Sequence, residues 1–188
     1  MRLGIAHHFG WAVAVTASAD HRVADRRRIE LVEPGLPTAP IHHREGKALG
    51  DSDLAALVAK VRASAIRATS ASLDRLSAAL HEPILSLSLR EWPSDFPADI
   101  AVLRRAPFES QADSVMYREV LAELARARGW EVCFYDARKV EDQAAAVLGE
   151  RADEVLRGPR ATLGPPWTQD HRMALAATIM AEPLARRS

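Results

Sequence analysis

Apolar residues open the chain in two short runs, and an alternating segment follows them. Residues 2–8 and 11–17 are rich in β-forming side chains, and residues 18–21 have the composition of a turn. Residues 22–33 follow this turn, and polar and apolar positions alternate in their second half, from Arg28 to Glu33, before Pro34 and Gly35. Alternation with a period of two is typical of strands, and proline ends a ladder because it lacks an N–H donor. We therefore predict a meander of three strands.

Helical spacing predicts a long helix between residues 51 and 80. Leucine, valine and alanine return at intervals of three and four positions along this stretch. Asp51 or Ser52 can cap the first turn, and Pro83 prevents the helix from continuing. The serine-rich residues 70–72 weaken the pattern, so we expect a bend or a break there.

Strands and helices alternate in the second half of the chain. The predicted elements are strands at 84–89 and 130–136 and helices at 110–128, 138–148 and 168–182. Irregular segments are expected at 34–50, 93–107 and 149–166, which are rich in proline and glycine. Asp113 stands three residues after Ser110, which is the spacing of a capping box.

The order of elements is β-β-β-α-β-α-β-α, with one additional short helix. Strands that are joined through helices lie parallel, because the crossover returns the chain to the same edge of the sheet. We predict an α/β fold in which a mixed five-stranded sheet carries helices on both faces. A length of 188 residues fits a single domain over 1–188.

Composition and charge narrow the class of protein. Hydrophobic residues make up 48% and charged residues 27% of the chain, which is typical of a globular protein. The 25 basic residues equal the 25 acidic ones, so no strong positive field attracts nucleic acid. Cys133 is the one cysteine, which excludes a disulfide framework and a cysteine metal site. With no apparent signal peptide or membrane span, we expect a cytoplasmic bacterial protein and no membrane partner.

Two stretches resemble the ribonuclease-H-like fold, and within it the Holliday-junction resolvases. The stretch "LGIAHHFGWAVAV" is similar to their first hairpin, whose strand reads Leu-Gly-Ile-Asp. The stretch "TQDHRMALAATIMA" is similar to their last helix, which starts with an acidic residue and continues in alanine-rich turns. The whole chain also resembles an uncharacterised bacterial family, through Gly10-Trp11-Ala12, residues 113–118 and residues 164–171.

The resemblance implies a site for two divalent metals and also shows where the chain departs from it. In active relatives, carboxylates from the first strand, the fourth strand and the last helix converge on two metals that activate a water. Glu91 and Asp170 match two of these positions. Ala6 replaces the first-strand aspartate, and Met173 stands where a second helix carboxylate is common. We therefore predict a degraded two-metal site.

The remaining polar residues still define a candidate site. Alternation along the first strand places His8 on the side of the vacated aspartate position and His7 on the other. Asp170 and His171 are expected opposite His8. His8, Glu91 and Asp170 are the candidate ligands of one divalent metal, Mg, Mn or Zn. Glu91, Asp170 and His171 are the candidate catalytic acid–base residues.

Each of these residues also has a structural alternative. Asp170 is favourable at a helix N-terminus in any protein, and His8 is compatible with a hairpin turn. The arginines at 26–28 form a candidate phosphate patch, but an edge strand carries basic residues to block sheet-to-sheet pairing, and we favour that reading. His42 and His43 lie in a loop that could fold over the cleft.

Three functions remain open. The first is a non-catalytic binding or scaffold module with a degraded metal site, which Ala6 and Met173 favour, with a homodimer as the candidate assembly. The second is a divalent-metal-dependent phosphodiesterase, a nuclease acting on nucleic acid. The third is a small-ligand site between the last helix and the sheet, which a pocket lined by His8 and Trp167 would support.

Overall fold

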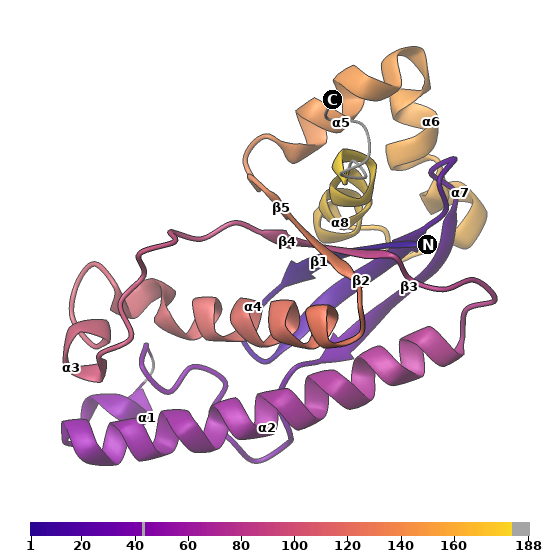
Figure 1. Cartoon of the computed structure of the whole chain (residues 1–188). Helices are drawn as coiled ribbons and strands as arrows, with labels where there is room; N and C mark the ends of the chain where they lie inside the picture. Colours follow the sequence, from indigo (N-terminus) through magenta and orange to yellow (C-terminus); the bar gives the residue numbers. More distant parts are fainter. Residues whose placement is uncertain (43, 182–188) are drawn as a thin grey trace.

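A mixed five-stranded sheet forms the centre of the molecule (Figure 1). The computed structural model describes residues 1–42 and 44–181. The strands are β1 (Arg2–His7), β2 (Trp11–Ala17), β3 (Val23–Glu30), β4 (Ser86–Arg90) and β5 (Glu131–Tyr135). Their order in space is β3-β2-β1-β4-β5; β1, β2 and β3 pair antiparallel, while β4 is parallel to both β1 and β5. This order and pairing confirm the predicted mixed five-stranded sheet of an α/β fold.

Helices cover both faces of the sheet, as the sequence predicts (Figure 1). The helices α2 (Asp51–Ala78) and α4 (Glu109–Ala127) pack on one face, and α8 (Gln169–Met180) packs on the other with α5 (Val140–Leu148) beside it. The short helical segments are α1 (Arg44–Lys47), α3 (Ile100–Leu103), η1 (Gly149–Arg151), α6 (Ala152–Arg157) and α7 (Pro159–Leu163). The sheet thus separates two hydrophobic cores.

Side chains of β1 alternate between these two cores. Leu3 and Ile5 are fully buried with the residues of α2 and α4, whereas Ala6 belongs to the core beneath α8. Each buried leucine or isoleucine contributes about 2 kcal/mol of hydrophobic stabilisation. The alternation therefore decides which helix each residue of the first hairpin faces.

The helix α8 lies unusually close to the sheet because glycine and serine provide the space. A Cβ atom on Gly4 would stand 1.8 Å from the carbonyl oxygen of Ala174, so only glycine fits there. On the neighbouring strand, the Ser88 hydroxyl donates to the Ala177 carbonyl oxygen at 3.0 Å. These two contacts fix α8 over the junction of β1 and β4 and place its N-terminus near the end of β1.

The predicted break in the long helix does not occur. The helix α2 runs without interruption from Asp51 to Ala78, and Gly50 occupies the N-cap position, where no side chain caps the helix. Ser72 is buried and its hydroxyl donates to the Glu30 carbonyl oxygen at 2.9 Å. The serines reduce the apolar pattern because they form a polar contact between α2 and β3, which sequence periodicity does not reveal.

The predicted capping role of Asp113 is wrong. The helix α4 begins at Glu109 and has Phe108 at its N-cap, one turn before Asp113. The Asp113 carboxylate is buried and accepts hydrogen bonds from the backbone N–H groups of Ile41 and His42. Asp113 therefore holds the 34–50 loop against α4. His43 and the predicted helix end at 182 lie outside the described residues.

All three segments expected to be irregular contain short helices. The helix α1 lies within 34–50. Within 93–107, Asp99 caps α3 by accepting a hydrogen bond from the Ala101 N–H at 2.8 Å. Within 149–166, η1, α6 and α7 follow one another beside α8. Helices of three to six residues are too short for periodicity to be visible in a sequence, which explains why the pattern missed them.

Candidate functional site

The two adjacent histidines point to opposite faces of the sheet. His8 Nε2 lies 3.0 Å from Asp170 Oδ2, on the α8 side. His7 Nε2 lies 2.9 Å from the Ser114 hydroxyl of α4, on the other side. The alternation argued from the sequence therefore holds for both residues, and the predicted approach of Asp170 to His8 is confirmed.

Trp11 holds the His8 ring in place. The two rings stack with their centroids 4.1 Å apart and their planes 12° from parallel. The Arg28 guanidinium lies over the Trp11 ring at 4.3 Å from its centroid, and it also pairs with Glu30 at 2.9 Å. With Asp170 on one ring nitrogen, His8 has a fixed orientation, which is the arrangement that proton transfer by an imidazole requires.

The three arginines of β3 divide between the two faces, as alternation predicts. Arg26 and Arg28 pair in register with Val15 and Val13 of the α8-side core, whereas Arg27 pairs with Ala14 of the other core. The strand β3 lies at the edge of the sheet, so the predicted edge position is confirmed. Charged side chains at an edge oppose pairing with a second sheet.

The fourth strand presents an arginine where the resemblance required a carboxylate. Gly4 pairs with Ser88 in the parallel ladder, and continuing that register places Ala6 level with Arg90. Ser88 faces α8, so Arg90, two residues on, belongs to the same face of the strand. The last α8-facing position of β4 thus carries a cation. Glu91, the residue predicted for it, is one position too late.

The backbone of Glu91 continues the hydrogen-bond ladder between β4 and β5, and the residue is exposed. Its N–H donates to the Tyr135 carbonyl oxygen at 3.0 Å, and its own carbonyl oxygen accepts from Arg118 Nη1 at 2.7 Å. Its side chain lines a cavity of about 420 Å³ together with Asp136 and Arg138. Leucine and serine alternate in "LSLSLRE", and this alternation places Arg90 on the same face of β4 as the serines. The sequence alone did not show that the serine face packs against α8.

The predicted metal set of His8, Glu91 and Asp170 does not fit this arrangement. Within residues 1–42 and 44–181, no three histidine, cysteine, aspartate or glutamate side chains are grouped so that they could hold a metal ion. His8 and Asp170 form a pair, and Glu91 does not join them. Two ligands are too few for a protein Zn²⁺ site, which takes three or four.

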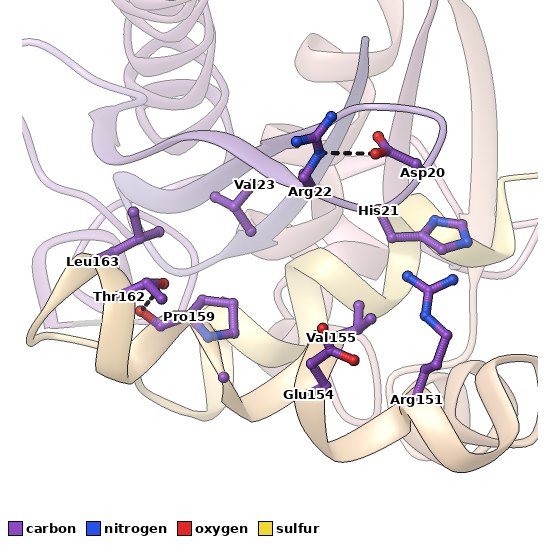
Figure 2. A pocket seen from close by; sticks show the side chains of 11 residues that line it. Asp20, His21, Arg22, Val23, Arg151, Glu154, Val155, Pro159, Thr162 and Leu163 are labelled. Carbon is purple, nitrogen blue, oxygen red and sulfur yellow. Dashed lines mark hydrogen bonds and ion pairs between the residues drawn. The ribbon is translucent and has the colours of Figure 1, made fainter.

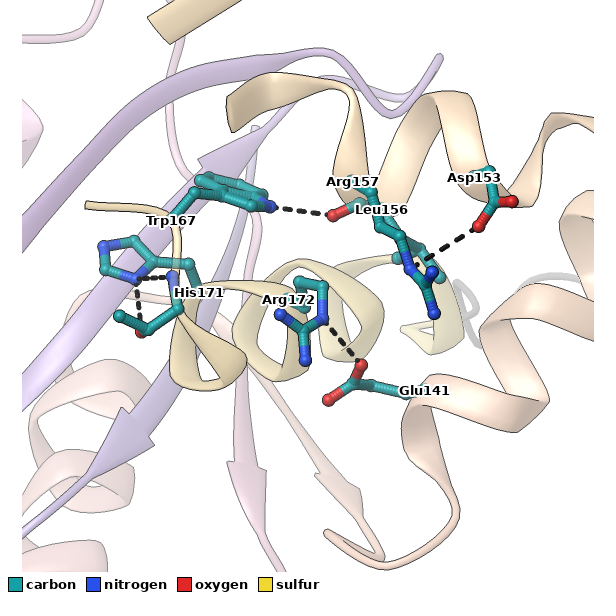
Figure 3. A network of polar contacts seen from close by, with 8 residues as sticks. Glu141, Asp153, Leu156, Arg157, Trp167, His171 and Arg172 are labelled. Carbon is teal, nitrogen blue, oxygen red and sulfur yellow. Dashed lines mark hydrogen bonds and ion pairs between the residues drawn. The ribbon is translucent and has the colours of Figure 1, made fainter. Parts of the chain in front are cut away.

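His171 has a structural role at the start of α8 (Figure 3). Thr168 and His171 form a reciprocal capping box, in which the Thr168 N–H donates to His171 Nδ1 at 3.2 Å. Burial and the nearby Arg26 lower the pKa of His171. The candidate catalytic set is therefore not assembled around one point: His8 contacts Asp170, while His171 and Glu91 make other contacts.

A cavity of about 460 Å³ lies between α8 and the β2–β3 side of the sheet. Trp11, Arg28, Asp170 and His171 are among the residues that line it. Trp167 is instead buried, and its Nε1–H donates to the Leu156 carbonyl oxygen at 2.8 Å (Figure 3). A cavity between α8 and the sheet is therefore present, but neither His8 nor Trp167, the two residues that would have supported a small-ligand site, lines it.

Ionic contacts attach the surrounding helices to α8. Arg172 pairs with Glu141 of α5 at 3.1 Å (Figure 3). Arg26 donates to the carbonyl oxygens of Leu163 and Pro166, which fixes the segment that enters α8. The position of Asp170 therefore depends on the sheet edge and on α5 as well as on its own helix.

A second cavity lies at the same end of β1 and is lined by groups from both faces of the sheet. Its volume is about 390 Å³ and its walls are His7, His8, Phe9, Trp11, Arg90 and Ser114. Burial, the guanidinium groups of Arg118 and Arg90, and the His8 ring lower the pKa of His7 to about 3. His7 is therefore neutral at physiological pH.

A further cavity, of about 330 Å³, separates the β2–β3 turn from α6 and α7 (Figure 2). His21 and Arg151 point toward one another across it, and Arg22 pairs with Asp20 at 2.8 Å (Figure 2). His21 has a positive φ of 70°, which is uncommon for a residue with a side chain. This cavity is at the opposite end of β2 from Trp11 and contains none of the candidate residues.

No protein-family profile and no curated protein matches the chain. Among solved structures, the chain is similar to RuvC of T. thermophilus in complex with Holliday junction substrate, at 17% identity and a TM-score of 0.47. The match covers 95% of this chain and 90% of that chain. In the described ranges, every helix is too short or too polar to cross a membrane.

Proposed function

We propose that this chain is a non-catalytic binding module on a ribonuclease-H-like fold, in which protein cations have replaced the two-metal site. The observation that carries the proposal is Ala6 at the first-strand position, together with Arg90 in the wall of the cavity at the end of β1. Two-metal chemistry needs several carboxylates to balance the charge of the ions. A guanidinium at this place adds positive charge, so it repels divalent metals and favours an anionic partner.

Metal titration tests the proposal directly. Mg²⁺, Mn²⁺ and Zn²⁺ are added in turn while the melting temperature is measured, because an ion bound only by the folded state stabilises it by mass action. We expect the melting temperature to stay the same in each metal. In parallel, single-stranded, duplex and branched DNA and RNA are expected to remain uncleaved.

The rival function, a metal-dependent phosphodiesterase, predicts the opposite pattern. It requires a metal-linked stabilisation of a few kcal/mol at saturating metal. That stabilisation would disappear in Asp170→Ala and persist in Asp153→Ala, a control that removes an exposed carboxylate of α6. Metal-dependent cleavage together with this pattern would overturn the binding module.

Nucleic acid is the proposed partner, with contacts on the α8 side of the hairpin. Arg26 and Arg28 line the cavity there and supply positive charge, which suits phosphates, and the Arg28 guanidinium lies over the Trp11 ring. The chain has no net charge, so binding is expected to depend on this local patch. A homodimer is the proposed assembly, and light scattering would test it by a mass twice that of one chain.

A further inference from the structure

Two arginines beside the hairpin cavity lack an acidic partner. In the described part of the chain, no carboxylate forms an ion pair with Arg90 or Arg118, and the Arg90 side chain has no hydrogen-bond partner. Arg90 is exposed and lines the cavity, whereas Arg118 is only 4% exposed. A buried charge without a counter-ion is unfavourable, so an anion would stabilise the buried Arg118, and the exposed Arg90 adds a second cation at the cavity wall.

The pKa values agree with this excess of positive charge. Burial and the neighbouring Arg90 lower the pKa of Arg118 to about 10. The same two guanidinium groups, after burial, lower the pKa of His7. The charged forms of Arg118 and His7 are thus less favourable than they would be in water. An anion bound between these two groups would stabilise their charged forms.

Ser114 connects the buried arginine to the cavity. Its hydroxyl oxygen accepts from Arg118 Nη2 at 3.1 Å and lies 2.9 Å from His7 Nε2. A neutral imidazole carries its proton on one nitrogen. When His7 carries it on Nε2 and donates to Ser114, the hydroxyl accepts two hydrogen bonds and its own proton is available to a ligand in the cavity.

The acidic groups nearby are already engaged or lie elsewhere. Asp170 is bound by His8 at 3.0 Å. Glu91 and Asp136 line the adjoining cavity, which Arg138 and Arg90 also line. The cavity that contains His7, Arg90 and Ser114 has no carboxylate in its wall. Its volume of about 390 Å³ is large enough for a phosphate group and part of the molecule that carries it.

We propose that this cavity is an oxyanion site that binds a phosphate monoester through Arg90 and Ser114, with the charge of Arg118 behind them. Two guanidinium groups match the charge of a phosphate dianion, and no metal takes part. The site rests on the binding role proposed above and adds the class of ligand. The phosphate belongs either to a small phosphorylated molecule or to the end of a nucleic-acid strand.

Calorimetric titration with inorganic phosphate, at an ionic strength held constant with chloride, tests the site. We expect saturable binding by the wild-type protein. Arg90→Gln is expected to weaken it roughly tenfold or more, the loss of a hydrogen bond to a charged group. Arg138→Gln is the matched control, because it removes the same charge from an exposed position beside the adjoining cavity, and it is expected to bind as the wild type does.

Nuclear magnetic resonance of the histidine rings provides a measurement that needs no variant. Added phosphate should shift the His7 ring signals, because the bound anion changes the field at the ring. His81, which precedes the opposite end of β4, should not respond. An absence of saturable phosphate binding in the wild type, or equal weakening in Arg90→Gln and Arg138→Gln, would overturn the site.

The source of the phosphate is resolved by three further ligands. A 5′-mononucleotide that binds more tightly than phosphate indicates a small phosphorylated molecule. A 5′-phosphorylated oligonucleotide that binds more tightly than the mononucleotide, and than the same strand without its phosphate, indicates a strand end. These results are independent of the metal titration: failure of phosphate binding leaves the non-catalytic module standing, and metal-dependent cleavage overturns that module whatever phosphate does.

Discussion

At the scale of single residues, His7 shows how a neighbouring charge changes the chemistry of a side chain. The ring is held against Ser114, and Arg118 donates to the same hydroxyl. His8, the next residue, instead contacts the carboxylate of Asp170. Adjacent identical residues therefore occupy a cationic environment and an acidic one, because the strand turns each successive side chain to the other face.

The low pKa of His7 predicts that the protein loses stability in mild acid. Burial, Arg118 and Arg90 lower this pKa from 6.5 to about 3 in the folded protein. Below pH 6.5 the unfolded chain binds a proton that the folded ring does not, so stability falls as the pH drops toward 3. Between about pH 7 and about pH 5 the expected loss is about 2 kcal/mol.

Urea unfolding of the wild type and His7→Gln at both pH values measures this contribution. Glutamine retains a polar group for Ser114 and does not titrate, so its stability should depend less on pH. The pKa values of His21 and His171 are also lowered and act in the same direction, but both proteins contain them. An equal loss in the two proteins would show that His7 titrates alike in the folded and unfolded states.

At the scale of elements, the N-terminus of α8 positions the acidic half of the His8–Asp170 pair. The helix begins with the capping box of Thr168 and His171, and Arg26 holds the segment before it. Gly4 allows the following turns to lie directly on β1. The pair therefore depends on how the helix starts and on how closely it packs.

Removal of the cap should loosen this pair. Thr168→Ala takes away the side-chain oxygen that accepts from the N–H of the third helical residue, at an expected cost of about 1 kcal/mol. Urea unfolding measures the loss of stability, and the ring signals of His8 report the contact with Asp170. The exposed Thr162→Ala in α7 serves as the control. A change in stability without a change at His8 would show that packing alone holds Asp170.

At the scale of the whole molecule, the site lies at one end of the sheet, where groups from both faces meet. His8, Asp170 and Arg28 come from the α8 side, and His7 and Ser114 from the α4 side. Trp11 lines the cavities on both sides. A ligand at this end can therefore contact both layers of helices.

Trp11 provides a test of nucleic-acid binding at this scale. His8 and Arg28 both lie against the Trp11 ring, so Trp11→Ala releases the Arg28 guanidinium and is expected to weaken binding of single-stranded DNA about fivefold. Fluorescence anisotropy of labelled strands at several salt concentrations measures the change. Phe96→Ala is the control, because it also removes an aromatic ring but lies in the loop after β4 and not in the first hairpin. There Phe96 packs edge-on against Phe108. Equal weakening by both variants would exclude the hairpin as the contact surface.

Much of the architecture follows from local patterns. Alternation and helical spacing predict the five strands, the long helices and the opposite orientations of His7 and His8, because each depends on residues near one another in the chain. The same reasoning identifies Ala6 as a departure from the metal-binding pattern. Short helices and the contacts of buried polar residues such as Asp113 were missed, since their partners are distant in sequence.

The sequence by itself thus determined the sheet, its layers and the faces of the first strand, because periodicity encodes which side of an element is buried. Only the tertiary structure decided the site. It brought Arg90, and not Glu91, into the cavity with His7 and His8, and it placed Ser114 between His7 and Arg118. The physical reason is register: a shift of one residue moves a strand's side chains to the other face, and pairing between distant strands selects the register.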